Sequence, residues 1–427
     1  MVTNKKMLSK HAKKQYILLI SASFFLFLVL NNPFFIKEEK TEVSLNNETE
    51  NEEVSPIELF NDSYKVIKRN YWDKHSADNE LYRFKIRYAN QIKDEEDAKV
   101  AINTMLASLN DPYSKFLDEK EFEEQNTSIN SKIYGIGINI ASSAGKIIII
   151  NVIKGTPADF AGLKSGDMIT KVNGKNVQGK SLIQIATYIK NPDMETVNME
   201  IMRGNKKFIK QIKKTEIKIK TVKSEIIDKK IGYIKITSFI SNDTPIEFIE
   251  ALDKVKDTDA LILDLRGNTG GLFQNAVFVA DLFLKDKNIV SVLGRGGKKN
   301  IYKTHDKGYV YEKPMAVLVD SESASASEIV SGALKDNKRA LIIGTKTFGK
   351  GLVQKVFPMP NNTGLNLTIA RYLTPLDIDI NKKGIKPDYL VQITKEDQIT
   401  NTDSQLNFAI KTLQTVVARN KIAQKAN

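Results

Sequence analysis

The length, composition and charge of the chain set the first limits on its function. It has 427 residues, 41% of them hydrophobic, which is enough for a large core spread over two or three domains. The absence of cysteine excludes disulfides, zinc–thiolate sites and cysteine nucleophiles, and three scattered histidines argue against a histidine metal cluster. The net charge of +13 comes mostly from dispersed lysines, which is typical of a solvated surface and argues against a nucleic-acid partner.

Residues 1–36 predict an export signal or a membrane anchor. Five lysines in residues 1–15 precede an uncharged run of 15 residues, Tyr16 to Leu30, and apolar character resumes up to Ile36. A basic segment followed by an apolar one is the order of an export signal whose lysines stay in the cytoplasm. The shorter run fits a cleavable signal, but the stretch from Tyr16 to Ile36 is 21 residues, long enough to span a bilayer. Because no small-x-small cleavage site follows, we favour an uncleaved anchor.

The next two segments differ sharply in composition. Residues 37–55 contain seven glutamates and almost no apolar side chains, so we expect a disordered linker. Residues 56–125 show apolar residues at three- and four-residue spacing, which predicts a helical region. Asn110-Asp-Pro-Tyr-Ser114 interrupts that pattern and predicts a break in the chain.

Residues 126–216 read as a small, mostly β domain. Short β-branched runs, separated by Gly-Lys, Asn-Gly and Gly-Asn turns, predict strands over 147–153, 168–172, 197–202 and 208–212. Helices are expected over 157–162 and 182–190. The loop Tyr134-Gly135-Ile136-Gly137 enters a strand, and its successive amides are suited to binding a peptide carboxylate while the peptide adds to the sheet edge.

Residues 217–395 predict an α/β layer. Residues 396–427 predict a packing helix, whose apolar pattern covers 403–418. Strands over 232–236, 260–265, 315–319 and 340–343 alternate with helices that end near 255 and span 274–284 and 325–337. After the second strand, three glycines in the segment Asp264 to Gly271 let backbone amides converge, as an oxyanion hole or a phosphate cradle requires. A tight turn is the alternative explanation of these glycines.

Ser325 is a candidate nucleophile at the start of a predicted helix. The amide of the next residue, Ala326, points out of the helix N-terminus and suits an oxyanion donor. The alternative is structural, because Ser325 and Glu328 form the pattern of a capping box. Ser323 and Ser327 compete with Ser325 for either role.

Lys350 is the candidate base, since none of the three histidines is close in sequence to another catalytic candidate. It lies between two glycines, and a desolvated lysine near no carboxylate loses its proton readily and can then accept a proton from serine. Gln354 is placed to orient either group. Gly344 to Lys350 also matches part of a phosphate-binding P-loop, but Gly351 stands where Ser or Thr would ligate magnesium, and a strand rather than a helix is expected next.

These motifs together resemble two known families. Gly155-Thr-Pro157-Ala-x-x-Ala161-Gly162-Leu-x-x-Gly166-Asp167 resembles a PDZ domain. The motifs around Asp264 to Gly271, Ser323 to Glu328 and Thr347 to Gln354 resemble the carboxyl-terminal processing peptidases, or tail-specific proteases, with Asn110 to Ser114 and Gly384-Ile-Lys-Pro387-Asp388 matching too.

The resemblance implies roles for individual residues. Ser325 would be the nucleophile, Lys350 the general base and Gln354 a positioning residue, and Gly271 and Ala326 would supply the oxyanion amides. It implies an α/β multi-domain protein, with a crotonase-like catalytic core, an inserted PDZ domain that gates it and an N-terminal helical region. Where relatives often carry a gating arginine at the end of the second PDZ helix, this chain has Lys190.

We therefore expect a Ser/Lys serine endopeptidase that needs no metal or organic cofactor. Its partners would be protein substrates with accessible apolar C-terminal tails, and the membrane through the N-terminal segment; its oligomeric state is left open. It would act outside the cytoplasm, in a bacterial periplasm or anchored to the inner membrane, or in the thylakoid lumen for a plastid or cyanobacterial source. The alternative is a PDZ-bearing peptide-binding or chaperone protein with an inactive peptidase core.

Overall fold

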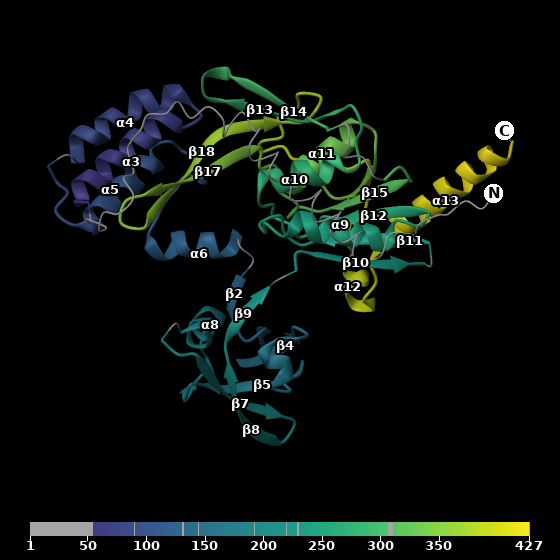
Figure 1. The fold of residues 1–427 in the computed structure, drawn as a ribbon, viewed down its shortest axis with the longest axis horizontal. Coiled ribbons are helices and arrows are strands. Elements are labelled where there is room, and N and C mark those ends of the chain that lie inside the picture. Colours follow the sequence, from purple (N-terminus) through teal and green to yellow (C-terminus); the bar gives the residue numbers. More distant parts are fainter. Residues whose placement is uncertain are drawn as a thin grey trace, which may run out of the picture. The chain divides into compact units, whose positions relative to one another are not determined.

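The computed structural model describes residues 54–426, apart from 89, 130, 131, 144, 192, 219, 229 and 306–310 (Figure 1). The predicted anchor over 1–36 and nearly all of the predicted linker lie outside the described residues. Within the described part of the chain, no helix combines the length and the apolar character needed to cross a bilayer.

The first described region is mainly helical, as predicted. Helices α3 (Pro56–Asn70), α4 (Lys74–Tyr88), α5 (Glu95–Ala107) and α6 (Glu119–Ile129) contain one short strand among them, β1 (Lys115–Leu117). Their apolar side chains form one core that includes two residues from a distant strand, β18 (Thr363–Leu373). Strand β1 also pairs with β18, so the helical region is joined to the later part of the chain by a sheet as well as by packing.

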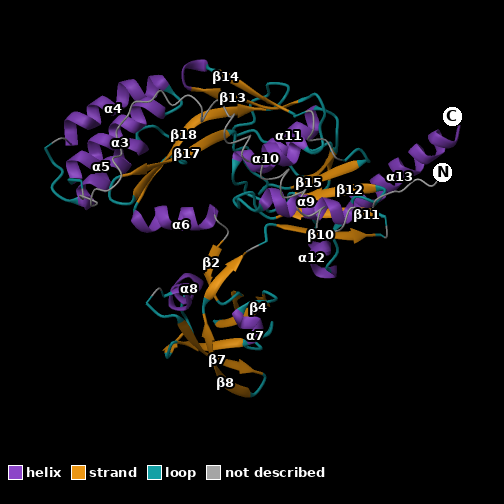
Figure 2. Cartoon of the chain, in the orientation of Figure 1, coloured by secondary structure: helices purple, strands orange, loops and turns teal. Residues whose placement is uncertain are grey.

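The predicted β domain forms a sheet of order β3-β4-β5-β7-β8, with β6 paired to β5, and two helices (Figure 2). All four predicted strands and both helices are present. The bounds are β3 (Ile138–Ser143), β4 (Lys146–Val152), α7 (Pro157–Phe160), β5 (Met168–Val172), β6 (Lys175–Asn176), α8 (Leu182–Lys190), β7 (Thr196–Arg203) and β8 (Lys206–Lys213). A separate ribbon of β2 (Lys132–Gly135) and β9 (Thr215–Lys218) brackets it. Strand β3 lies at the sheet edge.

The predicted α/β layer is built on a six-stranded sheet of order β10-β11-β12-β15-β16-β19. It is parallel from β11 onward, and β12 and β15 are buried throughout, which explains their continuous apolar sequences. Helices α9, α10 and α11 cover one face and α13 the other (Figure 1). The bounds are β10 (Val222–Ile227), β11 (Ile231–Ile236), α9 (Thr244–Val255), β12 (Ala260–Asp264), α10 (Phe273–Asp281), β15 (Met315–Val319), α11 (Ala326–Asp336), β16 (Leu341–Gly344), β19 (Tyr389–Leu390), α12 (Lys395–Thr400) and α13 (Ser404–Ala426).

A second, antiparallel sheet was only partly predicted. It contains β13 (Asn288–Gly294), β14 (Lys299–Lys303), β17 (Leu352–Met359) and β18, together with β1. The strand expected after Gly351 is β17. The turn between β17 and β18 has positive φ at Asn361 and Asn362, the conformation that tight hairpin turns require and asparagine tolerates. Between β16 and β17 the chain passes from the parallel sheet to the antiparallel sheet. Lys350 lies in this connecting segment.

Candidate active site

One cavity brings together all five predicted catalytic and oxyanion residues. It has a volume of about 530 Å³, and its lining includes Gly271, Ser325, Ala326, Lys350 and Gln354. The first four follow the carboxyl ends of β12, β15 and β16, which are adjacent and parallel. The loops after adjacent parallel strands leave the sheet at the same edge, so residues up to 79 apart in sequence meet in one cavity.

Ser325 has a strained backbone. It is the N-cap of α11, with φ 53° and ψ −112°, outside the region that side chains other than glycine populate comfortably. Such strain costs of the order of 1–3 kcal/mol and is concentrated at functional sites. A side chain at Gly270 would come within 2.8 Å of the Ser325 Cβ atom, so the glycine permits the loop after β12 to touch the serine.

The two competing serines have structural partners. The Ser323 hydroxyl is buried and donates to the Leu265 carbonyl oxygen at 2.9 Å. The Ser327 hydroxyl is also buried and donates to the carbonyl oxygen of Asn268 at 2.8 Å. Both serines therefore hold the loop after β12 against the start of α11, whereas Ser325 lines the cavity.

Lys350 is half-buried, and burial lowers the pKa of its amine below the ordinary lysine value. The expectation of a lysine without a nearby carboxylate is wrong, because Asp111 acts on it electrostatically and raises that pKa. The effect of burial is the larger, so the neutral amine is still favoured relative to a free lysine. The Lys350 Nζ atom lies 4.6 Å from the centroid of the Tyr113 ring.

The buried carboxylate of Glu328 connects the serine loop to the lysine loop. One of its oxygens accepts the backbone N–H groups of Ser325 at 2.9 Å and Lys350 at 2.8 Å. The other accepts the Gly349 N–H at 2.7 Å and the Thr347 hydroxyl at 2.6 Å. Glu328 bonds back to the N-cap as the predicted capping box requires, and the same carboxylate also positions the backbone of the candidate base.

Tyr372 from β18 supports the same two loops. Its hydroxyl lies 3.0 Å from the carbonyl oxygen of Ser325 and 2.6 Å from that of Lys350, so it can donate to either. Burial, and then the nearby Glu328, raise the pKa of Tyr372 well above its usual value. The phenol therefore remains a hydrogen-bond donor at any physiological pH.

The candidate oxyanion amides, those of Gly271 and Ala326, donate no hydrogen bond to another residue in the described part of the chain. Ala326 is the first residue of α11, where a free amide is expected. Gly271 lies so close to Phe239 that a Cβ atom would sit 2.2 Å from the Phe239 carbonyl carbon. Both amides remain available for a developing oxyanion.

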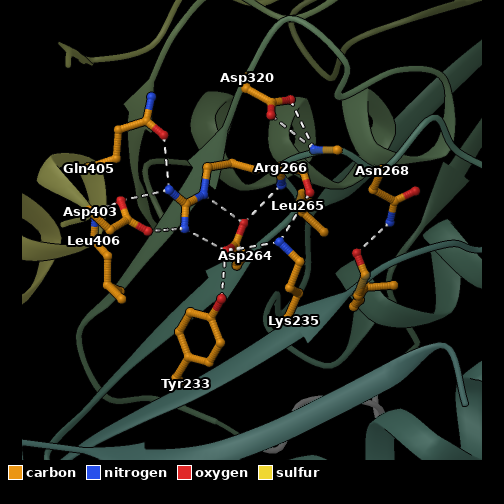
Figure 3. A network of polar contacts seen from close by, with 12 residues as sticks. Tyr233, Lys235, Asp264, Leu265, Arg266, Asn268, Asp320, Asp403, Gln405 and Leu406 are labelled. Atoms are coloured by element: carbon orange, nitrogen blue, oxygen red, sulfur yellow. Dashed lines mark hydrogen bonds and ion pairs between the residues drawn. The ribbon is translucent and has the colours of Figure 1, made fainter. Parts of the chain in front are cut away.

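A polar network fixes the loop that supplies Gly271 (Figure 3). The buried Asp264 accepts two hydrogen bonds from the Arg266 guanidinium at 3.0 and 2.7 Å, and the same guanidinium donates to Asp403 just before α13. Burial alone would raise the pKa of the Asp264 carboxyl, but Arg266 outweighs it and holds that pKa below its usual value. The Gly267 N–H donates to Asp320 at the end of β15. The loop is thus tied to both the sheet and the C-terminal helix.

Gln354 lines the cavity from β17, at a β-bulge in the pairing with β18. Its amide group donates to the Thr368 hydroxyl at 3.4 Å, a long hydrogen bond. A weakly held amide can turn toward a substrate or toward the lysine amine, so the orienting role stays a prediction.

Among the histidine side chains that the structure describes, none belongs to this cavity. His305 lies against Asp281, with Nδ1 and Oδ2 3.2 Å apart, and neither residue lines the cavity.

The predicted peptide-binding loop lines a second cavity, of about 150 Å³. Tyr134, Gly135, Ile136 and Gly137 form one end of it, and the rest lies between the edge strand β3 and helix α8. The amides of Ile136 and Gly137 donate to no other described residue. Lys190, the gating candidate, is the exposed last residue of α8 and lines this groove.

Sequence reasoning missed the residues that surround the lysine. Asp111 and Tyr113 lie in the Asn110–Ser114 turn, which we identified only as a break and as a family motif. Tyr372 lies on a strand that we did not predict, and for Glu328 we predicted only the capping contact. None of these contacts has a local sequence signal, because each joins segments far apart in the chain.

Comparisons with known proteins show the family of the chain. The model of peptidase family S41 matches residues 230–391, and the PDZ domain model matches residues 135–213. Carboxy-terminal processing protease CtpA of Bacillus subtilis is 35% identical over 375 residues, which are 87% of this chain and 76% of that protein. The chloroplastic carboxyl-terminal-processing peptidase 2 of Arabidopsis thaliana is 33% identical, over 78% of this chain and 68% of that protein.

Solved structures of similar fold include proteases of the same kind. A photosystem II D1 C-terminal processing protease matches with a TM-score of 0.55 and 28% identity, over 79% of this chain and 94% of that one. A putative S41 protease from Bacteroides fragilis shares the fold with a TM-score of 0.55 at 18% identity, over 83% of this chain and 97% of that one. The predicted resemblance is confirmed: this chain belongs to the carboxy-terminal processing proteases, serine peptidases of family S41 that carry a PDZ domain.

Proposed function

We propose that this chain is an endopeptidase that cleaves exported proteins at or near their C-termini, with Ser325 as nucleophile and Lys350 as general base. The observation that carries the proposal is the single cavity lined by Ser325, Lys350 and the two free amides of Gly271 and Ala326. A nucleophile, a base with a lowered pKa and a pair of oxyanion donors are what acyl transfer needs.

In the acylation step, the neutral Lys350 amine takes the hydroxyl proton as the Ser325 oxygen adds to the carbonyl carbon of the scissile bond. The carbonyl electron pair moves to its oxygen, and the Gly271 and Ala326 amides donate hydrogen bonds to that oxyanion. When the C–N bond breaks, the carbonyl re-forms and the leaving amine takes the proton from Lys350. An ester between Ser325 and the substrate remains.

In the deacylation step, Lys350 takes a proton from a water molecule that adds to the ester carbonyl. Breakdown of this second intermediate expels the Ser325 oxygen, which recovers the proton from Lys350. Gln354 orients the Lys350 amine or the Ser325 hydroxyl through its side-chain amide. These steps use groups of the protein and one water molecule, and no metal or organic cofactor is part of the proposal.

Substrate choice is assigned to the groove between β3 and α8. The free amides of Ile136 and Gly137 suit a terminal carboxylate, and the edge strand β3 can pair with the incoming chain. Apolar side chains such as Ile140, Ile153 and Ile189 line the groove and favour an apolar last residue. Lys190, at the end of α8, is the candidate for coupling groove occupancy to catalysis.

Ser325→Ala should abolish peptide-bond hydrolysis and leave the fold intact. Its effect on the free energy of unfolding should stay within about 1 kcal/mol, the scale of losing a helix cap. Cleavage assays and thermal unfolding on the same preparations test this, with Ser323→Ala as the matched control. Because Ser323 is a buried structural serine, its variant should lose stability and retain hydrolysis in the folded fraction. An active Ser325→Ala, or an inactive peptidase core in the wild type, contradicts the proposal.

Lys350→Arg should be almost as inactive as Lys350→Ala. Arginine keeps the positive charge but does not lose its proton near neutral pH. In the wild type, kcat/KM should rise with pH through the pKa of Lys350, and because burial lowers that pKa, the rise should lie below the range of an ordinary lysine. A pH–rate profile on a short peptide measures both. Full activity of the arginine variant would leave Lys350 as a structural cation.

Amidation of a substrate C-terminus should weaken its binding to the groove by roughly 1–3 kcal/mol, since it removes a charge-assisted hydrogen-bond acceptor. Calorimetry with paired free and amidated peptides on the Ser325→Ala variant measures binding without cleavage. Cleavage of a short peptide that enters the active site directly should change less. Equal affinity of the two peptides would mean that the groove reads side chains alone.

We also propose that residues 1–36 place the peptidase outside the cytoplasm, because a lysine-rich start followed by an apolar run is the order of an export signal. In bacterial spheroplasts, added protease should digest the full chain and spare a cytoplasmic marker. Deleting residues 1–36 should make the chain as protected as that marker. Protection of the full chain would refute the assignment, and release of a shortened chain would favour a cleaved signal over an anchor.

A further inference from the structure

The Asn110–Ser114 turn brings an aromatic ring to the candidate base. The Lys350 Nζ atom lies 4.6 Å from the centroid of the Tyr113 ring, within the range of a cation–π interaction. Both side chains are half-buried, so the contact is partly shielded from water. Tyr113 precedes β1 by two residues, whereas Lys350 follows β16, and the two are 237 positions apart in sequence.

Hydrogen bonds hold this turn in one conformation. Asp111 accepts the Tyr113 N–H at 3.0 Å and the Ser114 hydroxyl at 2.6 Å. The Ser114 oxygen in turn accepts the Thr368 N–H at 3.0 Å, and the Tyr113 carbonyl oxygen accepts from the Asn366 side chain at 3.1 Å. The turn is therefore fastened to β18, the strand that also supplies Tyr372 to the site and pairs with the strand of Gln354.

The pKa values of Lys350 and Tyr113 depend on burial and on nearby acidic groups. Asp111 raises the pKa of Lys350, against the larger lowering by burial. Burial, then Asp111 and Glu328, raise the pKa of Tyr113, so its ring stays a neutral phenol. Asp111 and Tyr113 from the turn act on the amine, whereas Glu328 from α11 and Tyr372 from β18 contact the Lys350 backbone, at its N–H and its carbonyl oxygen.

We propose that Tyr113 is a positioning residue for Lys350, with its ring face holding the amine in the cavity that the lysine shares with Ser325 and with Asp111 setting the charge beside it. The inference rests on the proposed base role of Lys350. A lysine side chain has four rotatable bonds, and a base must stay within hydrogen-bond reach of the proton it takes. A flat aromatic face that is itself fixed to β18 restricts those rotations without offering the amine a competing proton acceptor.

The main test compares Tyr113→Leu with Tyr113→Phe on a short peptide substrate. Leucine keeps apolar bulk but removes the ring, so kcat should fall by about 10- to 100-fold, the scale of misplacing a catalytic group, while KM changes little. Phenylalanine keeps the ring face and should recover most of the lost kcat. Wild-type kcat in Tyr113→Leu, or equal losses in both variants, would overturn the inference.

A second comparison separates charge from structure. Asp111→Asn removes the charge that raises the pKa of Lys350, so the rise of kcat/KM with pH should move to lower pH. Ser114→Ala breaks a hydrogen bond of the same turn but keeps the charge, so its profile should show no such move. Identical profiles for the two variants would contradict a charge role for Asp111.

A double-mutant cycle shows whether Tyr113 acts through the lysine. In a Lys350→Ala background, Tyr113→Leu should have no further effect on the residual rate. A full additional loss there would mean that Tyr113 acts independently and would overturn the inference. If Lys350 is not the base, the Lys350→Arg variant will be active. If Lys350→Arg is inactive but Tyr113→Leu is fully active, only the positioning role of Tyr113 is rejected.

Discussion

The proposed active site depends on one buried carboxylate. Glu328 lies on α11 and accepts four hydrogen bonds, two from the lysine loop's backbone, one from the Thr347 hydroxyl and one from the Ser325 amide. Without it, two buried and two partly buried donors would lose their acceptor, and a buried donor left unpaired costs about 1–3 kcal/mol. Because its two oxygens are fixed to one helix, Glu328 sets the relative position of the loop after β15 and the loop after β16. The backbones of the proposed nucleophile and the proposed base are thus positioned by the same carboxylate.

This arrangement explains how a capping motif and a proposed catalytic motif can share the same residues. A helix-capping residue is held by hydrogen bonds to the helix, whereas a nucleophile needs an exposed side chain on a rigid turn. Here the acid of the capping box holds the amide of Ser325, and the residue keeps a strained φ of 53° and ψ of −112°. Tyr372 and the contact with Gly270 hold the same turn from other sides. Several independent contacts are needed to keep such a conformation populated.

The site also requires segments from both ends of the chain. The turn that carries Asp111 and Tyr113 belongs to the N-terminal helical region, which is joined to the antiparallel sheet through the pairing of β1 with β18. Asp403, just before the C-terminal helix, binds Arg266 and so stabilises the loop of the candidate oxyanion amide (Figure 3). Both terminal regions therefore contribute contacts to the proposed catalytic site, although the lysine and the serine both lie in the α/β layer.

Much of this protein followed from local sequence signals. The alternation of buried strands with helices, the runs of the β domain and the glycine-rich loops are short-range patterns, and the motifs around Ser325 and Lys350 identified residues that do line one cavity. Some helix ends differ, with α10 stopping at Asp281 rather than near 284 and α13 continuing past 418 through exposed residues that carry no apolar pattern. Only the tertiary structure decided which groups surround the lysine, that Glu328 serves two loops, that Ser325 is strained and that Tyr113 faces the amine. Each of these features depends on segments that are far apart in sequence and that the sheets bring together. A local pattern of side chains cannot predict such contacts.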